Sequence, residues 1–254
     1  MSLQDARTLG WLVPDWSAPT QVQAITTTRH GGGSRPPFAS LNLGDHVGDD
    51  GLQVARNRQR VNEVLRLPTE PLWLEQVHGT EVAAMNVADC YPKADAAVAL
   101  RPRQVCVVMT ADCLPVLFCD RQGSKVAAAH AGWRGLCNGV LEQTVARLGG
   151  EAAELLAWLG PAIGPAAFEV GEEVRTAFMA HDPAAAEAFV PGQARGKWLA
   201  DIYQLARQRL QACGIPAAAI TGGDYCTYSD AQRFFSYRRD GQTGRMGSLI
   251  WLAS

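Results

Sequence analysis

Apolar residues recur with two different periods along the chain of 254 residues. Short apolar runs bounded by turn residues predict β-strands at residues 22–27, 72–75, 82–87, 96–100, 105–109, 116–119, 126–129, 155–159, 219–221 and 248–252. Apolar positions with helical spacing predict helices at residues 54–65, 140–148, 172–179, 184–189 and 199–213. Asp49 and Asp50 stand where they could cap the first of these helices.

The order of these elements predicts the fold class. Strands gather in the middle of the chain and helices follow them, which favours an α+β fold over an alternating parallel fold or a TIM barrel. We expect a single layered domain over residues 1–254, with a central mixed or antiparallel sheet flanked by helices. A long loop is expected from residue 28 to about residue 50. Its triplet Gly31-Gly32-Gly33 matches neither nucleotide-binding loop pattern, so the triplet is interpreted as flexible.

Composition narrows the classes of partner. With 23 Lys and Arg against 25 Asp and Glu, the net charge of -2 gives no positive field for nucleic acid or anionic lipid. We expect neither a signal peptide nor a membrane-spanning segment, and therefore a cytoplasmic protein. The seven cysteines form an odd set without framework spacing, which predicts reduced thiols. Cys106 and Cys119 lie in apolar runs, which is typical of buried, packed cysteines. Cys113 stands out by its position, because it follows the polar residue Asp112.

Three segments place a metal-ligand type next to a predicted strand. They are Gln76-Val-His-Gly-Thr, Thr110-Ala-Asp-Cys-Leu-Pro and Ala129-His-Ala-Gly-Trp-Arg-Gly, and they contribute His78, Cys113 and His130. Two imidazoles and a thiolate suit zinc, and three protein ligands leave the fourth position open for catalysis. Their spacing alone fits hydrogen-bonded loop histidines and a packed cysteine as well. A fourth ligand, His46 or Asp95, would close the site.

Further unusual segments lie along the chain: Ser40-Leu-Asn-Leu-Gly, His46-Val-Gly-Asp, Ala94-Asp-Ala, Gly160-Pro-Ala-Ile-Gly-Pro, Cys226-Thr, Phe234-Phe-Ser-Tyr-Arg-Arg-Asp-Gly and Thr243-Gly-Arg-Met. With the three ligand segments, they make the sequence resemble the YfiH/laccase-domain family. The resemblance implies that His78, Cys113 and His130 hold a catalytic zinc. It implies a purine nucleoside phosphorylase acting on adenosine, inosine and methylthioadenosine, with adenosine deaminase activity in the same site.

The family has also been described in two other ways, as copper polyphenol oxidases and as cell-wall precursor editing enzymes. The chain has five histidines, too few for the blue-copper centre and trinuclear cluster of a laccase. A single copper site with two His, one Cys and an axial Met would be possible, but no Met lies in the three ligand segments. Zinc is therefore the expected cofactor, with copper as the alternative. The sequence does not separate a nucleoside from a cell-wall precursor, and a metal-stabilised binding module is a third alternative.

Phosphorolysis requires inorganic phosphate beside the metal. A helix expected to begin near Leu136 or Asn138 offers free amides, and Arg134 could join them to bind the anion. Alternatively, Arg134 pairs with a surface carboxylate. Trp133 could stack on a purine or pack in the core.

Other polar residues are candidates for binding the nucleoside. Asn42 and His46 could orient ribose or base, and Arg29 and Arg238 offer positive charge. Loop-stabilising roles are the alternative for all four. Asp112 is next to Cys113, but strand alternation directs it away from the ligand, so a supporting role is expected rather than proton transfer.

Overall fold

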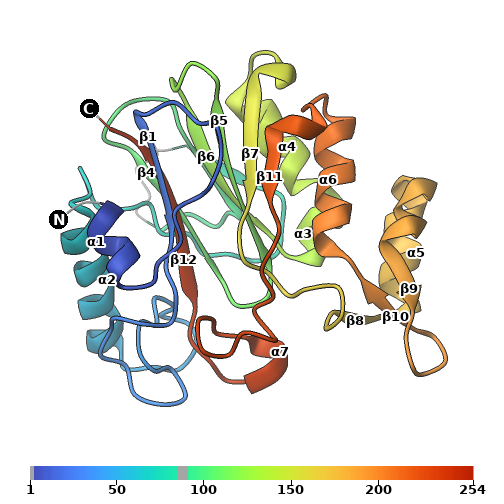
Figure 1. Ribbon diagram of the computed structural model, residues 1–254, viewed down its shortest axis with the longest axis horizontal. Helices are drawn as coiled ribbons and strands as arrows, with labels where there is room; N and C mark the ends of the chain where they lie inside the picture. The colour runs from blue at the N-terminus through green and yellow to red at the C-terminus, as the bar shows by residue number, and fades with distance from the viewer. Residues whose placement is uncertain (1–2, 85–90, 254) are drawn as a thin grey trace.

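Two β-sheets pack face to face at the centre of the computed structural model, which describes residues 3–84 and 91–253 (Figure 1). The larger sheet has six strands in the order β11 (Ile220–Gly222), β7 (Leu155–Leu159), β5 (Leu114–Asp120), β6 (Val126–Ala131), β3 (Ala96–Ala99) and β2 (Val82–Ala84). It is mixed, because β7 with β11 and β2 with β3 are parallel pairs and the pairs between them are antiparallel. The second sheet has the order β1 (Val22–Thr26), β12 (Met246–Leu252) and β4 (Val105–Thr110), all antiparallel.

Helices cover the outer faces of both sheets, so the molecule has four layers (Figure 1). Helices α4 (Val140–Leu148) and α6 (Ile202–Ala212) bury their apolar sides against the six-stranded sheet. Helix α2 (Gly51–Leu65), with α1 (Leu3–Thr8) beside it, packs on the second sheet. The sequence-based expectation of an α+β protein with a central mixed sheet between helices is confirmed.

Smaller elements lie at the ends of the layers. Strands β8 (Glu169–Gly171), β10 (Lys197–Ala200) and β9 (Phe189–Pro191) form a third sheet next to α5 (Glu172–His181). Three short 3-10 helices span Ala152–Glu154, Pro183–Ala188 and Ala217–Ala219. Helices α3 (Trp133–Asn138) and α7 (Tyr237–Asp240) lie near the ligand segments.

Several predicted elements differ from the structure. The strand at residues 105–109 belongs to the second sheet, and residues 72–75 form isolated bridges only. Residues 184–189 are largely a 3-10 helix rather than an α-helix. The helix expected over 199–213 begins at Ile202, because Lys197–Ala200 pairs as β10 and Asp201 caps the helix. Of the strand expected over 82–87, residues 85–87 lie outside the described residues.

The loop between β1 and α2 is packed rather than flexible. Asn57 of α2 is buried, and its side-chain oxygen accepts the Gly33 N–H at 3.0 Å. A Cβ atom on Gly32 would lie 2.3 Å from the carbonyl oxygen of Ser40, so only glycine fits there. Of the two candidate caps, Asp50 accepts the amides of α2, while Asp49 accepts the hydroxyl of Ser34 at 2.6 Å. The expected flexibility of the glycine triplet is therefore wrong.

The helices and cysteines of the described residues agree with the expectations from composition. None of the helices there has both the length and the apolar character that a membrane crossing requires. The six cysteines within the described residues are all free thiols, as expected, and Cys90 lies outside them.

Candidate metal centre

Three segments far apart in the chain converge at one end of the six-stranded sheet. His130 is near the end of β6, and Cys113 directly precedes the neighbouring strand β5. His78 lies in the loop before β2, with a backbone φ of 61°. One ligand atom from each residue lies within 4.8 Å of the other two, and Cys113 Sγ is 3.8 Å from His78 Nε2. The sheet therefore assembles the ligand set that the sequence predicted.

This donor set fits a zinc ion. Tetrahedral zinc with bonds of about 2.0–2.3 Å separates its ligand atoms by about 3.5 Å, close to the spacing seen here. His78 is exposed, Cys113 is partly buried and His130 is 3% exposed, so the group opens to solvent on the His78 side. Among the described residues, the convergent group has three members, and neither His46 nor Asp95 is one of them.

Asp95 positions two of the three ligands. It is fully buried directly before β3, and its Oδ1 lies 2.8 Å from Nδ1 of His130. The same carboxylate accepts the backbone N–H of Val77, His78 and Gly79 at 3.2, 2.9 and 2.6 Å. Because Nδ1 of His130 faces Asp95, Nε2 is the nitrogen left for a metal. Asp95 thus fixes one imidazole and the loop that carries the other.

Two further contacts hold the loop of His78 against the sheet. The Gln76 side chain donates to the carbonyl oxygen of Met109 at 2.8 Å and accepts the Met109 N–H at 2.7 Å. A Cβ atom on Gly135 would lie 2.8 Å from the carbonyl oxygen of Gly79, so the start of α3 packs directly on this loop.

Gly132 makes room for the ligand atoms. A Cβ atom on this residue would lie 2.7 Å from Cδ2 of His78 and 3.0 Å from Sγ of Cys113. Helix α3 begins at Trp133, directly after Gly132, and not near Leu136 or Asn138 as expected. The glycines of the third ligand segment therefore have a packing role.

The ligand residues form a charge-coupled pair when no metal is bound. Burial raises the pKa of Cys113, but the charge of His130 and hydrogen bonds from both imidazoles outweigh it and bring the pKa to about 6. Burial lowers the pKa of His130, but the Cys113 thiolate and Asp95 outweigh it and bring the pKa to about 9. At neutral pH the pair is thus a thiolate and an imidazolium, and metal binding displaces the imidazolium proton.

Asp112 supports the site without facing it. Its carboxylate accepts the Thr227 hydroxyl at 2.6 Å and the Arg238 N–H at 2.7 Å. Its own carbonyl oxygen accepts the Ile163 N–H at 3.0 Å. These bonds join the Cys113 turn to two distant segments, which agrees with the supporting role expected for Asp112.

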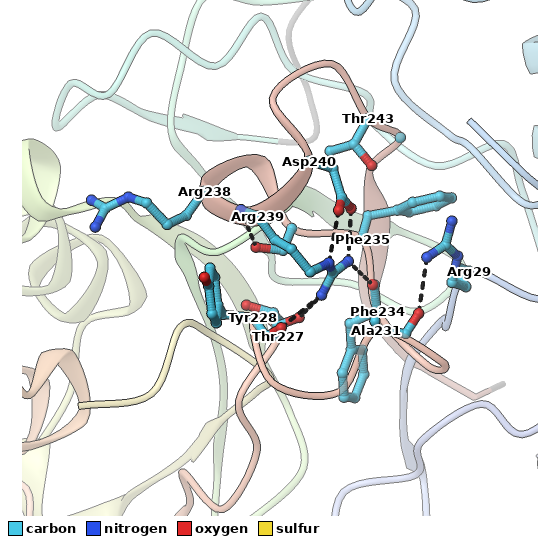
Figure 2. A network of polar contacts seen from close by, with 12 residues as sticks. Arg29, Thr227, Tyr228, Ala231, Phe234, Phe235, Arg238, Arg239, Asp240 and Thr243 are labelled. Carbon is cyan, nitrogen blue, oxygen red and sulfur yellow. Dashed lines mark hydrogen bonds and ion pairs between the residues drawn. The ribbon is translucent and has the colours of Figure 1, made fainter. Parts of the chain in front are cut away.

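The two arginines expected to supply charge bind backbone carbonyls. Arg29 donates to the carbonyl oxygens of Ala39 at 3.0 Å and Ala231 at 2.9 Å. Arg238 donates to that of Glu169 at 2.8 Å. Figure 2 shows them on opposite sides of Arg239, which binds the carbonyls of Thr227, Tyr228 and Phe234 and the carboxylate of Asp240. The structure does not bring Arg29 and Arg238 together.

The remaining candidates differ in how much of their polar surface is available. The Asn42 side chain is buried and exchanges hydrogen bonds with Gly44 at 2.9 and 3.0 Å. His46 is exposed, with Nδ1 3.5 Å from Asp45. Arg134 is exposed and stacks on Trp133 at 4.6 Å, with no carboxylate within ion-pair distance in the described part of the chain. The sequence pattern does not single out Arg245, although its segment Thr243-Gly-Arg-Met is unusual.

The fold and the site define a layered α+β protein with a candidate metal centre of two histidines and one cysteine. The chain belongs to the multi-copper polyphenol oxidoreductase laccase family, whose model matches residues 23–253.

Relatives and solved structures with this fold cover almost the whole chain. Proteins named purine nucleoside phosphorylase from Pseudomonas aeruginosa and from Escherichia coli, the latter called YfiH, are each 57% identical to it over 242 residues. Each alignment covers 95% of this chain and 98% of the relative. A crystal structure of a Neisseria meningitidis protein superposes with a TM-score of 0.90 at 51% identity, covering 96% of this chain and 99% of that one.

Proposed function

We propose that this protein is a zinc-dependent purine nucleoside phosphorylase acting on adenosine, inosine and methylthioadenosine, with adenosine deaminase activity in the same site. The observation that carries the proposal is the convergence of His78, Cys113 and His130 at a solvent-accessible sheet end. The names of relatives that are 57% identical support the reaction class.

The chain supplies an organised set of donors. Zinc bound there would act as a Lewis acid toward the group that fills its fourth position. Asp95 keeps the Nδ1 proton of His130 and so keeps the Nε2 lone pair directed at the site. The positive charge of His130 favours the Cys113 thiolate, which is the form that binds metal.

The two reactions make different demands on the same site. In phosphorolysis a phosphate oxygen bonds to C1′ of the ribose while the C1′–N9 bond breaks. The purine leaves with the bonding electrons and takes up a proton, which gives free purine and ribose 1-phosphate. In deamination, water replaces the amine on C6 of adenosine and ammonia leaves. His46, which is exposed, remains our candidate for contact with the ribose or base.

The test is a substrate screen with zinc-loaded protein. Adenosine, inosine and methylthioadenosine are incubated with and without inorganic phosphate, and products are separated by HPLC. We expect ribose 1-phosphate or its methylthio analogue only with phosphate, and inosine from adenosine in either case. Cys113→Ser, which keeps the residue's size but weakens the metal site, serves as the control. Free ribose formed equally well without phosphate would exclude phosphorolysis.

The same screen tests the two other functions described for the family. Turnover confined to cell-wall precursors would favour precursor editing. Oxidation of phenols by copper-loaded protein, with no nucleoside turnover under any condition, would favour polyphenol oxidation.

Arg134 is proposed to attract phosphate toward the site. Its guanidinium is exposed, so solvent screens its charge. We expect Arg134→Ala to raise the phosphate KM more than the nucleoside KM, as saturation curves in each substrate would show. Equal KM values in the variant and the parent protein would make Arg134 a surface residue only.

A further inference from the structure

Arg245 is brought beside the ligand turn by strand pairing. It directly precedes β12, and the first residue of that strand, Met246, pairs with Thr110 at the end of β4. The antiparallel register places Arg245 alongside the turn from Ala111 to Cys113. The ligand cysteine and this arginine are therefore neighbours although they are far apart in the sequence.

The loop before α2 holds the backbone of Arg245 and the aliphatic part of its side chain in place. The buried side-chain oxygen of Asn42 accepts the Arg245 N–H at 2.9 Å, and the Leu43 N–H donates to the Arg245 carbonyl oxygen at 3.2 Å. Gly44 lies so close that a Cβ atom on it would be 2.8 Å from Cγ of Arg245. Asn42 thus acts as a positioning residue for Arg245.

The guanidinium of Arg245 is only partly satisfied by protein. Nη1 donates to the carbonyl oxygens of Thr243 and Gly244 at 3.0 and 3.1 Å. Within residues 3–84 and 91–253, neither Nε nor Nη2 has a hydrogen-bond acceptor, and no carboxylate lies within 4.0 Å of the group. Nearby Arg58 and Arg239, in contrast, have ion pairs with Asp45 and Asp240.

An anion can reach the free side of the Arg245 guanidinium. Arg245 is partly buried, and burial lowers its pKa while the charges of Cys113 and Asp112 oppose that effect. Nε and Nη2 are not among the buried atoms that lack a hydrogen-bond partner in the described residues, so these two nitrogens stay accessible to a ligand from solvent. The N–H groups of Nε and Nη2 lie side by side on the guanidinium and can donate to two oxygens of one phosphate. The ammonium group of a lysine has no such fixed pair of donors.

We propose that Arg245 binds inorganic phosphate directly, through Nε and Nη2, in a subsite beside Cys113 and the two histidines. The choice of phosphate rests on the phosphorolysis proposed above, whereas the choice of residue rests on the geometry of Arg245. Asn42 and Gly44 fix the arginine, so the subsite is formed before phosphate arrives.

The test measures phosphate binding apart from turnover. Binding of inorganic phosphate to zinc-loaded protein is followed by isothermal titration calorimetry for the parent protein, Arg245→Ala and Arg245→Lys. Arg121→Ala, at the opposite end of β5, is the control for loss of an arginine. We expect at least a tenfold loss of phosphate affinity in Arg245→Ala, a smaller loss in Arg245→Lys and none in Arg121→Ala. Zinc content and circular dichroism should be the same in all four proteins.

Kinetics separate this inference from the proposed function. We expect Arg245→Ala to raise the phosphate KM at least tenfold and the nucleoside KM less than twofold. Unchanged phosphate affinity in Arg245→Ala, or no phosphate binding by the parent protein, would overturn the inference. Phosphate-dependent cleavage with a normal phosphate KM in Arg245→Ala would overturn it too, while leaving the function intact. Phosphate binding that depends on Arg245 in a protein that only hydrolyses nucleosides would support the subsite and refute the phosphorylase.

Discussion

Asp95 shows which part of the site the sequence could not reveal. Residue type and position next to predicted strands make His78, Cys113 and His130 candidate ligands, and the resemblance to the YfiH/laccase-domain family selects them. From the sequence, Asp95 is only a possible fourth ligand, because its contact with His130 depends on the pairing of Ala96 with Ala129. That pairing brings the carboxylate to Nδ1 of His130, and no local pattern in the sequence encodes it.

Replacing Asp95 by Asn should weaken zinc binding about 10–100-fold. Both carboxylate oxygens accept N–H groups, so either orientation of the amide would direct an NH2 group at another donor. Competition with a chromophoric chelator would measure the affinity. Asp120→Asn, a buried aspartate at the other end of β5, is the matched control and should keep normal zinc affinity. Equal affinity in Asp95→Asn would mean that His130 needs no orienting partner.

Zinc affinity should increase with pH, and the increase should be steeper below the pKa of Cys113 than above it. Between the pKa of Cys113 at about 6 and that of His130 at about 9, the metal displaces one proton from this pair. Affinity then rises about tenfold per pH unit from this pair, and more steeply below pH 6, because the thiol must lose its proton as well. Chelator competition across pH 5 to 9 measures both slopes. An affinity independent of pH would contradict the thiolate–imidazolium pair.

Elements with strong local signals were predicted best. The bounds of α4 and β7 match the sequence pattern residue for residue, since β7 is an apolar run, α4 has apolar positions at helical spacing, and a glycine follows each. The last two residues of β10, Leu199 and Ala200, fall in the range predicted to be a helix, because the pairing of β10 with β8 and β9 is not visible in the apolar pattern. The sheet to which β4 belongs was likewise decided by its pairing with β12. Sequence patterns thus gave the type of most elements but not their partners.

Gly132→Ala should disrupt the metal site by steric contact. The added methyl group would lie 2.7 Å from the His78 ring and 3.0 Å from Cys113 Sγ, so the exposed His78 loop must shift. We expect zinc occupancy to fall by more than half while the circular dichroism spectrum stays unchanged. Zinc per chain, measured by elemental analysis, decides the result. Gly51→Ala at the start of α2, where nothing lies within 4 Å of the added atom, should keep full occupancy.

At the scale of the whole molecule, the fold should not depend on the metal. One large apolar cluster joins the two sheets with α4 and α6, a second lies between the three-stranded sheet and α2, and Asp95 and Gln76 hold the His78 loop. We expect the chelated protein and His78→Ala, Cys113→Ala and His130→Ala to keep native circular dichroism but to lose turnover. A thousandfold excess of zinc over its Kd should add about 4 kcal/mol of stability, or on the order of 10 °C in Tm. Scanning calorimetry would show this shift, and an apoprotein without a cooperative transition would contradict it.

Strand β12 is the last strand of the chain and yet lies between β1 and β4. The hydroxyls of Thr26 and Ser248 are 2.8 Å apart across this sheet although the residues are 222 positions apart. During synthesis, β1 therefore leaves the ribosome long before β12, its strand partner in the sheet, exists. At about 5–20 residues per second that interval lasts roughly 10–40 seconds. Until β12 has been synthesised, the hydrogen-bonding edge of β1 lacks this strand partner. We therefore expect this half of the protein to fold only once β12 is available, and to need chaperone protection until then.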